Sequence, residues 1–248
     1  MILNPAFPPK TARFQKGGKL SAIGACCLLL AFLFLPLAGQ AQEAAPLDLA
    51  PLKKWLAYQS KVKTFAAHFT QSRRVKNFKK PLQSPGKLWF SAPGRFRWEI
   101  GDPPKNIAFL DQKELVIYQP GARRVKRFAL SDVADSQWAD TFNLAKMSFP
   151  HSLEELQKYF SIVSLQSSEQ HCVLALQLKS ERRRKLVKMA TIYFNPEKSG
   201  LLATEILFQN GSSIRNDFTE TFSNIEIPEA AFKMDFPEGT RFVEPLKR

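Results

Sequence analysis

The chain has 248 residues and a formal net charge of +14, from 36 Lys and Arg against 22 Asp and Glu. This basic balance suits an acidic partner such as nucleic acid. However, the cations are spread through alternating segments and no nucleic-acid-binding motif is present, so we expect no nucleic-acid partner. Two of the three cysteines, Cys26 and Cys27, lie in a leader-like segment, which leaves Cys172 without a partner and excludes a disulfide framework.

The first segment of the chain has the order of a secretory signal. Four cations and no acid precede the apolar run 20–38, which ends just before Ala41. This order is typical of a cleaved leader, so we expect residues 1–41 to be a signal peptide and residues 42–248 to form one domain. Two alternatives are an uncleaved anchor, because the run almost reaches the length that spans a bilayer, and lipidation at Cys26.

The segment after the leader has helical spacing. Leu49, Leu52 and Leu56 share one face, which predicts a helix in residues 47–58. Asp48 is the expected N-cap of this helix.

Strand patterns dominate the rest of the chain. Phe65 and Phe69 alternate with polar neighbours, and Asn210-Gly211 is a strong hairpin signal. Short strands joined by tight turns predict a mainly β fold built as an antiparallel meander. The expected strands lie near residues 64–70, 86–91, 95–100, 105–110, 114–119, 123–128, 159–166, 172–179, 187–194, 201–209 and 212–222.

Two segments interrupt the alternation. Residues 131–158 predict short helices, with Ser152 as a cap and Glu155 completing a capping box, and we expect these helices to lie across the mouth of the curved sheet. The run Arg182 to Lys185 is interpreted as a solvated hairpin loop, with a docking patch as the alternative. Cys172 lies in a strand-like segment and is expected to be a buried, inert thiol.

The predicted sheet has a strongly aromatic face. In residues 95–100 the apolar side chains alternate with Arg95, Arg97 and Glu99, so an extended strand points them to one face. With 21 phenylalanines in the chain, this face lines either an acyl-chain pocket or a dry core. The residues that we expect to line a lipid-binding cavity are Phe65, Phe69, Leu88, Phe90, Phe96, Trp98 and Ile100.

The same stretch resembles the LolA family of periplasmic lipoprotein carriers. Residues 60–71 look like the first strand of that family, and residues 225–242 look like its tail. The spaced matches between them are Gly86, Leu88, Trp89, Pro93, Phe96, Trp98, Pro103, Asp111, Lys113, Leu115, Tyr118 and Pro120.

The resemblance implies an incomplete antiparallel β-barrel of about eleven strands, with short helices as a lid over an apolar cavity. It further implies a monomer in the periplasm that binds lipoprotein acyl chains without covalent chemistry, an inner-membrane release transporter and an outer-membrane acceptor. Phe96 falls where the family has an aromatic residue important for cargo handling, and Trp89 and Trp98 belong to the same sheet.

Two positions depart from the family pattern. Ala92 stands where the family has an arginine that holds the lid closed, and alternation sends Arg95 and Arg97 to the face opposite Phe96. The usual Asp-Gly turn is replaced by Asp111-Gln112. These departures keep two alternatives open, an envelope sensor or scaffold and a carrier of another lipid.

The sequence gives no sign of catalysis. His68, His151 and His171 lack metal-ligand spacing, and neither a nucleophile elbow nor a phosphate-binding loop is present. We therefore expect a protein that is not an enzyme, with no catalytic residue, no bound metal and no cofactor.

Overall fold

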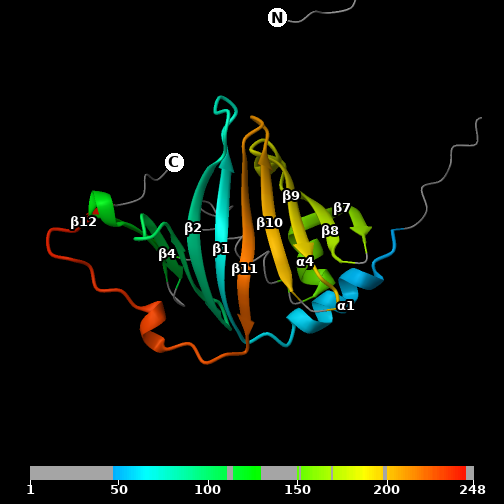
Figure 1. The fold of residues 1–248 in the computed structure, drawn as a ribbon, viewed down its shortest axis with the longest axis horizontal. Helices are drawn as coiled ribbons and strands as arrows, with labels where there is room; N and C mark the ends of the chain where they lie inside the picture. The colour runs from blue at the N-terminus through cyan, green and yellow to red at the C-terminus, as the bar shows by residue number, and fades with distance from the viewer. Residues whose placement is uncertain are drawn as a thin grey trace, which may run out of the picture. The chain divides into compact units, whose positions relative to one another are not determined.

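The structure, a computed structural model, describes residues 47–110, 114–129, 150, 152–168, 170–197 and 200–243. Within these residues twelve strands form one open sheet, in the order β12-β6-β5-β4-β3-β2-β1-β11-β10-β9-β8-β7 (Figure 1). The strands are β1 (Thr64–Arg74), β2 (Leu82–Ser91), β3 (Arg95–Ile100), β4 (Asn106–Leu110), β5 (Glu114–Gln119), β6 (Arg124–Ala129), β7 (Phe160–Ser167), β8 (Cys172–Leu178), β9 (Val187–Phe194), β10 (Leu201–Phe208), β11 (Ser213–Ser223) and β12 (Arg241–Val243).

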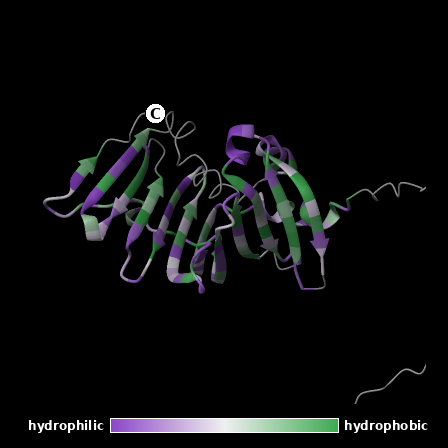
Figure 2. Cartoon of the chain, turned by 90° about the horizontal axis from the view of Figure 1, so that it is seen from above, coloured by the Kyte–Doolittle hydropathy of each residue, from purple (hydrophilic) through white to green (hydrophobic). Residues whose placement is uncertain are grey.

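The predicted antiparallel, mainly β architecture is confirmed, and the sheet does not close into a barrel. Neighbouring strands pair antiparallel except for β12, which pairs parallel with β6 through Arg241 and Arg124. This short strand was not predicted, because three residues are too few to show a period of two. Polar and apolar residues alternate along most strands in Figure 2, as expected for a sheet whose two faces meet different surroundings.

The described helices are short. They are α1 (Ala50–Gln59), α4 (Leu153–Tyr159), α5 (Glu181–Arg184) and the 3₁₀ turns η1 (Pro120–Ala122) and η2 (Glu229–Phe232). The N-cap of α1 is Leu49, not Asp48 as predicted, although an oxygen of Asp48 accepts a hydrogen bond of 2.9 Å from the amide of Ala50.

The predicted cap of α4 is confirmed by its geometry. Ser152 is the N-cap, and its hydroxyl accepts a hydrogen bond of 3.0 Å from the amide of Glu155. The other helices expected in residues 131–149 lie outside the described residues.

The predicted hairpin at Asn210-Gly211 is confirmed, because this turn joins the antiparallel strands β10 and β11 and Gly211 has a positive φ of +80°. Residues 181–184, interpreted as part of a hairpin loop, form the helical turn α5. This turn is stabilised in part by Arg184, which donates to the backbone oxygens of Leu178 and Lys179.

The strands β7 to β11 are covered on one face by helices. Residues of α1 and α4 pack with the apolar side chains of these strands into the largest buried cluster. Trp55 of α1 is fully buried and stacks on Phe194 of β9, with ring centroids 4.6 Å apart. We call this face of the sheet the inner face and the opposite one the outer face.

The strands β2 to β6 are covered on the outer face by the C-terminal segment 225–243, which we call the tail. Met234 and Phe236 of the tail pack against a buried cluster formed by Ile107, Phe109, Val116, Tyr118 and Val125. The rings of Tyr118 and Phe236 meet edge to face at 5.3 Å. In Figure 1 the tail (orange to red) passes the strands near β4 and ends at β12, whereas α1 (blue) lies near the β7–β10 strands.

Candidate functional site

The inner face of the β1–β6 strands carries a continuous row of apolar side chains. The register places Phe65 of β1 opposite Phe90 of β2 and Phe90 opposite Phe96 of β3. The row continues through Leu110 and Leu115 to Phe128 on β6. Since each pair lies directly across two strands, these side chains share one face and form one surface.

All seven residues predicted to line a cavity lie on this face. Leu88 pairs with Trp98, and Phe69 and Ile100 flank Gly86 from the strands on either side. Phe65, Phe69, Leu88 and Phe96 are buried, whereas Phe90, Trp98 and Ile100 are half-buried. The structure therefore places the predicted set on one face, but Phe65, Phe69 and Leu88 are buried in the cluster that contains α1 and α4, and Phe96 is buried in a different cluster.

The inner face is divided into two apolar clusters. Phe96, Leu110, Leu115, Ile117 and Phe128 form one, and its described members come only from the β2–β6 strands. The other is the cluster covered by α1 and α4, which holds Phe65 and Phe69 of β1 and Leu88 of β2 besides residues of β7 to β10. Phe90 and Trp98 pack against both, so they mark the junction between the two.

An aromatic stack occupies this junction. The ring of Phe69 lies 4.7 Å from that of Trp98 and 5.8 Å from that of Phe218. It also crosses directly over Gly86, where a side chain would collide with the ring. Gly86 is therefore required here because only a residue without a Cβ leaves room for Phe69.

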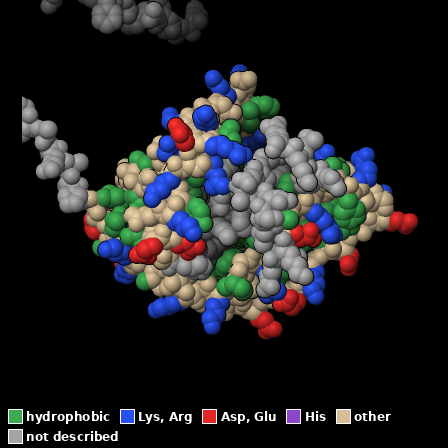
Figure 3. Space-filling model, turned by 180° about the vertical axis from the view of Figure 1, so that it is seen from behind, with side chains coloured by type: hydrophobic (Ala, Val, Ile, Leu, Met, Phe, Trp, Pro, Cys, Tyr) green, Lys and Arg blue, Asp and Glu red, His purple; other side chains and the backbone are tan. Residues whose placement is uncertain are grey.

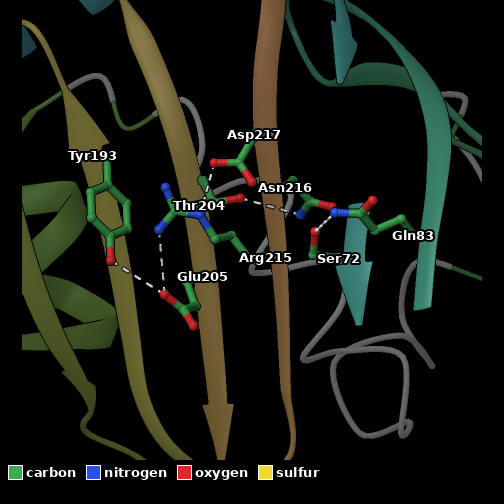
Figure 4. A network of polar contacts seen from close by, with 8 residues as sticks. All are labelled: Ser72, Gln83, Tyr193, Thr204, Glu205, Arg215, Asn216 and Asp217. Carbon is green, nitrogen blue, oxygen red and sulfur yellow. Dashed lines mark hydrogen bonds and ion pairs between the residues drawn. The ribbon is translucent and has the colours of Figure 1, made fainter. Parts of the chain in front are cut away.

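A polar strip borders the apolar face on β1, β11 and β10. Gln71 donates a hydrogen bond of 3.0 Å to Asn216. Asn216 donates in turn to the hydroxyl of Thr204 at 3.3 Å, as Figure 4 shows. Asn216 is buried, and these bonds satisfy its amide. Sequence reasoning missed this strip, although polar residues at inner-face positions of three strands are the signal that could have shown it.

The outer face of β9 to β11 carries a charged network. Arg215 contacts Glu205 at 3.6 Å and Asp217 at 2.8 Å, and its guanidinium lies 4.2 Å from the ring centre of Tyr193. Burial, followed by the charge of Glu205, raises the pKa of Tyr193 above its usual value. Burial acts to lower the pKa of Arg215, but the hydrogen bond and charge of Asp217 raise it. This network keeps the outer face polar.

Two arginines hold the tail on the outer face of β3. Arg95 makes two hydrogen bonds to the carboxylate of Glu229, 2.8 and 2.7 Å, and lies 4.8 Å from the ring centre of Phe232. Arg97 pairs with Glu99 at 2.6 Å and donates to the carbonyl oxygen of Lys233. The prediction that both arginines face away from Phe96 is thus confirmed.

The space under the tail is a cleft of about 440 Å³, lined by Trp89, Arg97, Glu99, Ala230, Ala231, Lys233, Met234 and Asp235. Trp89 shares the sheet with Trp98, as expected, but pairs with Arg97 and belongs to the opposite, outer face. Strand alternation accounts for this, since Trp89 follows Leu88 directly. The substituted turn at Asp111-Gln112 lies outside the described residues.

No group of His, Cys, Asp and Glu side chains in the described ranges could hold a metal ion, and the described part of the chain contains no helix long and apolar enough to cross a membrane. Cys172 is buried, as predicted, with its sulfur 3.4 Å from the hydroxyl of Ser167.

Comparison with known proteins identifies the family. The family model of the outer membrane lipoprotein carrier protein LolA matches residues 60–235, and the chain belongs to this family. The outer-membrane lipoprotein carrier protein of Chromobacterium violaceum is 25% identical over 201 residues, 81% of this chain and 90% of the relative. That of Legionella pneumophila (strain Lens) is 23% identical over 183 residues, 74% and 84% of the two chains.

Solved structures give a weaker likeness. The crystal structure of a LolA superfamily protein from Nitrosomonas europaea aligns with a TM-score of 0.39 and 9% identity. The alignment covers 75% of this chain and 99% of that one.

Proposed function

We propose that this protein is a periplasmic carrier that binds the acyl chains of a lipoprotein on the inner face of the β2–β6 strands. One observation carries the proposal: the seven apolar residues share one face of neighbouring strands, and Phe96, with Phe90 and Trp98 packed beside it, belongs to an apolar cluster of β2–β6 distinct from the cluster that contains α1 and α4. The family model and the names of the curated relatives support lipoprotein as the cargo.

The physical reason for a carrier is the cost of exposing acyl chains to water. Three chains of ordinary length hold about forty CH₂ groups, each worth about 0.8 kcal/mol on burial. A sheet face rich in aromatic and branched side chains replaces water at this surface without any bond being made. The protein therefore binds the acyl chains by reversible apolar contact. It carries them from an inner-membrane release transporter to an outer-membrane acceptor, and it is not an enzyme.

The test compares two phenylalanines with similar burial on opposite faces. Phe96 is 8% exposed on the inner face, and Phe109 is 6% exposed on the outer face, under the tail. The variants Phe96→Glu and Phe109→Glu are titrated with a fluorescent fatty acid and unfolded thermally. A carboxylate in a ligand surface opposes acyl binding, whereas one in a packed core opposes folding.

We expect Phe96→Glu to lose acyl binding and to keep most of its melting temperature, and Phe109→Glu to show the reverse. If Phe96→Glu unfolds while its residual folded fraction still binds the probe, Phe96 belongs to a dry core and the proposal fails.

The cargo is tested with a labelled lipoprotein in inner-membrane vesicles that contain the release transporter. The expected result is a one-to-one complex with this protein, and none with a cargo whose lipid-bearing cysteine is replaced by serine. Binding of the fatty acid without lipoprotein release indicates a carrier of another lipid. If the protein neither binds the fatty acid nor releases the lipoprotein, but binds the periplasmic segment of a membrane protein, it is a sensor or scaffold.

A further inference from the structure

The tip of the β1–β2 hairpin combines dense positive charge with exposed apolar side chains. Five of the eight residues in 73–80 are Lys or Arg, namely Arg73, Arg74, Lys76, Lys79 and Lys80. All five are exposed, and no carboxylate of the described residues pairs with them. The chain has no Asp or Glu at all from residue 69 to residue 98.

The apolar side chains of this tip have no cover. Phe78 is 58% exposed and Leu82 is 51% exposed. Phe78 stands within the seven-residue loop 75–81, where its amide donates to the carbonyl oxygen of Val75 at 2.9 Å. This bond turns the chain just before Phe78, and exposed apolar side chains surrounded by five cations are typical of an interaction site.

The neighbouring turns extend the positive surface. Because β1 and β11 are antiparallel, the β10–β11 turn lies at the same end of the sheet as the hairpin tip, and it is bonded to the α5 turn through Gln209 and Leu186. The α5 turn adds the cations of residues 182–185 and exposes Leu186 by 59%. In the described turns at this end, the acids are Asp102, Glu181 and Glu238. Lys and Arg side chains gather at the upper end of the view in Figure 3.

We propose that the tip of the β1–β2 hairpin docks on the anionic surface of a lipid bilayer. This inference goes beyond cargo binding and does not rest on it, because the hairpin tip lies at the end of the strands, away from the Phe96 surface. Lys and Arg side chains interact with lipid phosphates, and a ring such as that of Phe78 inserts at the level of the headgroups. An acidic protein surface would satisfy the cations but leaves Phe78 and Leu82 without an apolar partner.

The test measures binding of the protein, recovered from cells that express the full chain, to vesicles. Vesicles of phosphatidylcholine alone are compared with vesicles that also contain phosphatidylglycerol. The variant Lys76→Gln/Lys79→Gln/Lys80→Gln should bind the anionic vesicles about a hundredfold more weakly, from the typical contribution of each cation near such a surface. Phe78→Ser should weaken binding roughly tenfold, and Phe78→Trp should restore it.

The matched control makes the same charge change elsewhere. Lys53, Lys61 and Lys63 are exposed in α1 and the turn before β1, and the last two lie at the end of β1 opposite the hairpin tip. The triple Gln variant at these positions should keep nearly full binding. Thermal unfolding and fatty-acid binding of every variant should match the parent protein, which separates loss of docking from loss of fold or of cargo binding.

Three results would overturn the proposal. The first is equal binding to vesicles with and without phosphatidylglycerol, and the second is an equal loss of binding in the two triple variants. The third is no vesicle binding at all by the parent protein, with the hairpin lysines needed instead for an acidic protein partner.

Discussion

The two halves of the sheet are covered on opposite faces. Over β7–β11, α1 and α4 close the inner face, and the outer face carries the charged network around Arg215. Over β2–β6, the tail closes the outer face, and the apolar cluster around Phe96 takes no residue from the described helices. Since the strands of both halves alternate in the same way, the strands alone do not determine which face each described segment covers.

The largest loss of stability is expected in the helix-covered half. Trp55→Ala removes a fully buried ring that stacks on Phe194 and should lower the free energy of unfolding by about 3–5 kcal/mol, measured by denaturant titration. Trp55→Phe is the matched variant, because it keeps a ring and removes an indole N–H that has no hydrogen-bond partner among the described residues. A loss as large as that of Trp55→Ala would contradict the assignment of this half as a packed core.

The tail-covered half depends on a buried ion pair. The side chains of Arg97 and Glu99 are 14% and 11% exposed. Arg97→Met leaves the carboxylate of Glu99 buried without its cation and should cost about 3 kcal/mol of unfolding free energy. The double variant Arg97→Met/Glu99→Leu should recover most of this loss. If the double variant is no better than the single one, then the tail contacts of Arg97, and not the charge, stabilise this half.

The junction between the halves is sensitive to volume. In Gly86→Ala the new methyl group would meet the Phe69 ring and lie 2.8 Å from the carbonyl oxygen of Glu99, which should cost about 1–3 kcal/mol. Gly121→Ala is the control, since a Cβ there meets nothing within 4 Å. Equal melting temperatures for the two variants would show that the Phe69 stack is not a fixed part of the junction.

The smallest effect concerns pH at the tail. The hydrogen bonds and charge of Arg95 lower the pKa of Glu229 from its ordinary value of 4.5. A lowered pKa in the folded state contributes stability above the ordinary value, and this stability is lost as the pH falls through the folded value. The protection of the amides of residues 229–236, that is, their exchange rate relative to the intrinsic rate at the same pH, should therefore fall below about pH 4.5. Glu229→Gln should remove this loss of protection, and an unchanged profile in this variant would show that another group causes the loss.

Much of the strand pattern could be predicted from alternation and turn residues. The strands around Phe96 and Cys172 are confirmed, because a period of two survives wherever one face is buried. The same rule brought the seven candidate residues to one face, and it separated Trp89 from Trp98.

The covering segments could not be predicted in the same way. The tail contacts of Arg95 with Glu229 join residues 134 positions apart, and no local pattern encodes such a pair. The parallel strand β12 and the helical turn α5 are each too short for periodicity to appear. The sequence therefore predicts the faces of the sheet and leaves open which face each segment covers.

The proposed function requires that acyl chains contact the inner face of β2–β6 and no other apolar part of the protein. Three of the four tryptophans report on it: Trp98 lies on that face, Trp89 lines the cleft under the tail, and Trp55 lies in the helix-covered core. Single-tryptophan variants, with the other tryptophans replaced by phenylalanine, are titrated with a brominated fatty acid, which quenches indole fluorescence on contact. We expect strong quenching of Trp98 and little quenching of Trp89 or Trp55. Quenching of Trp89 alone, or of all three equally, would contradict it.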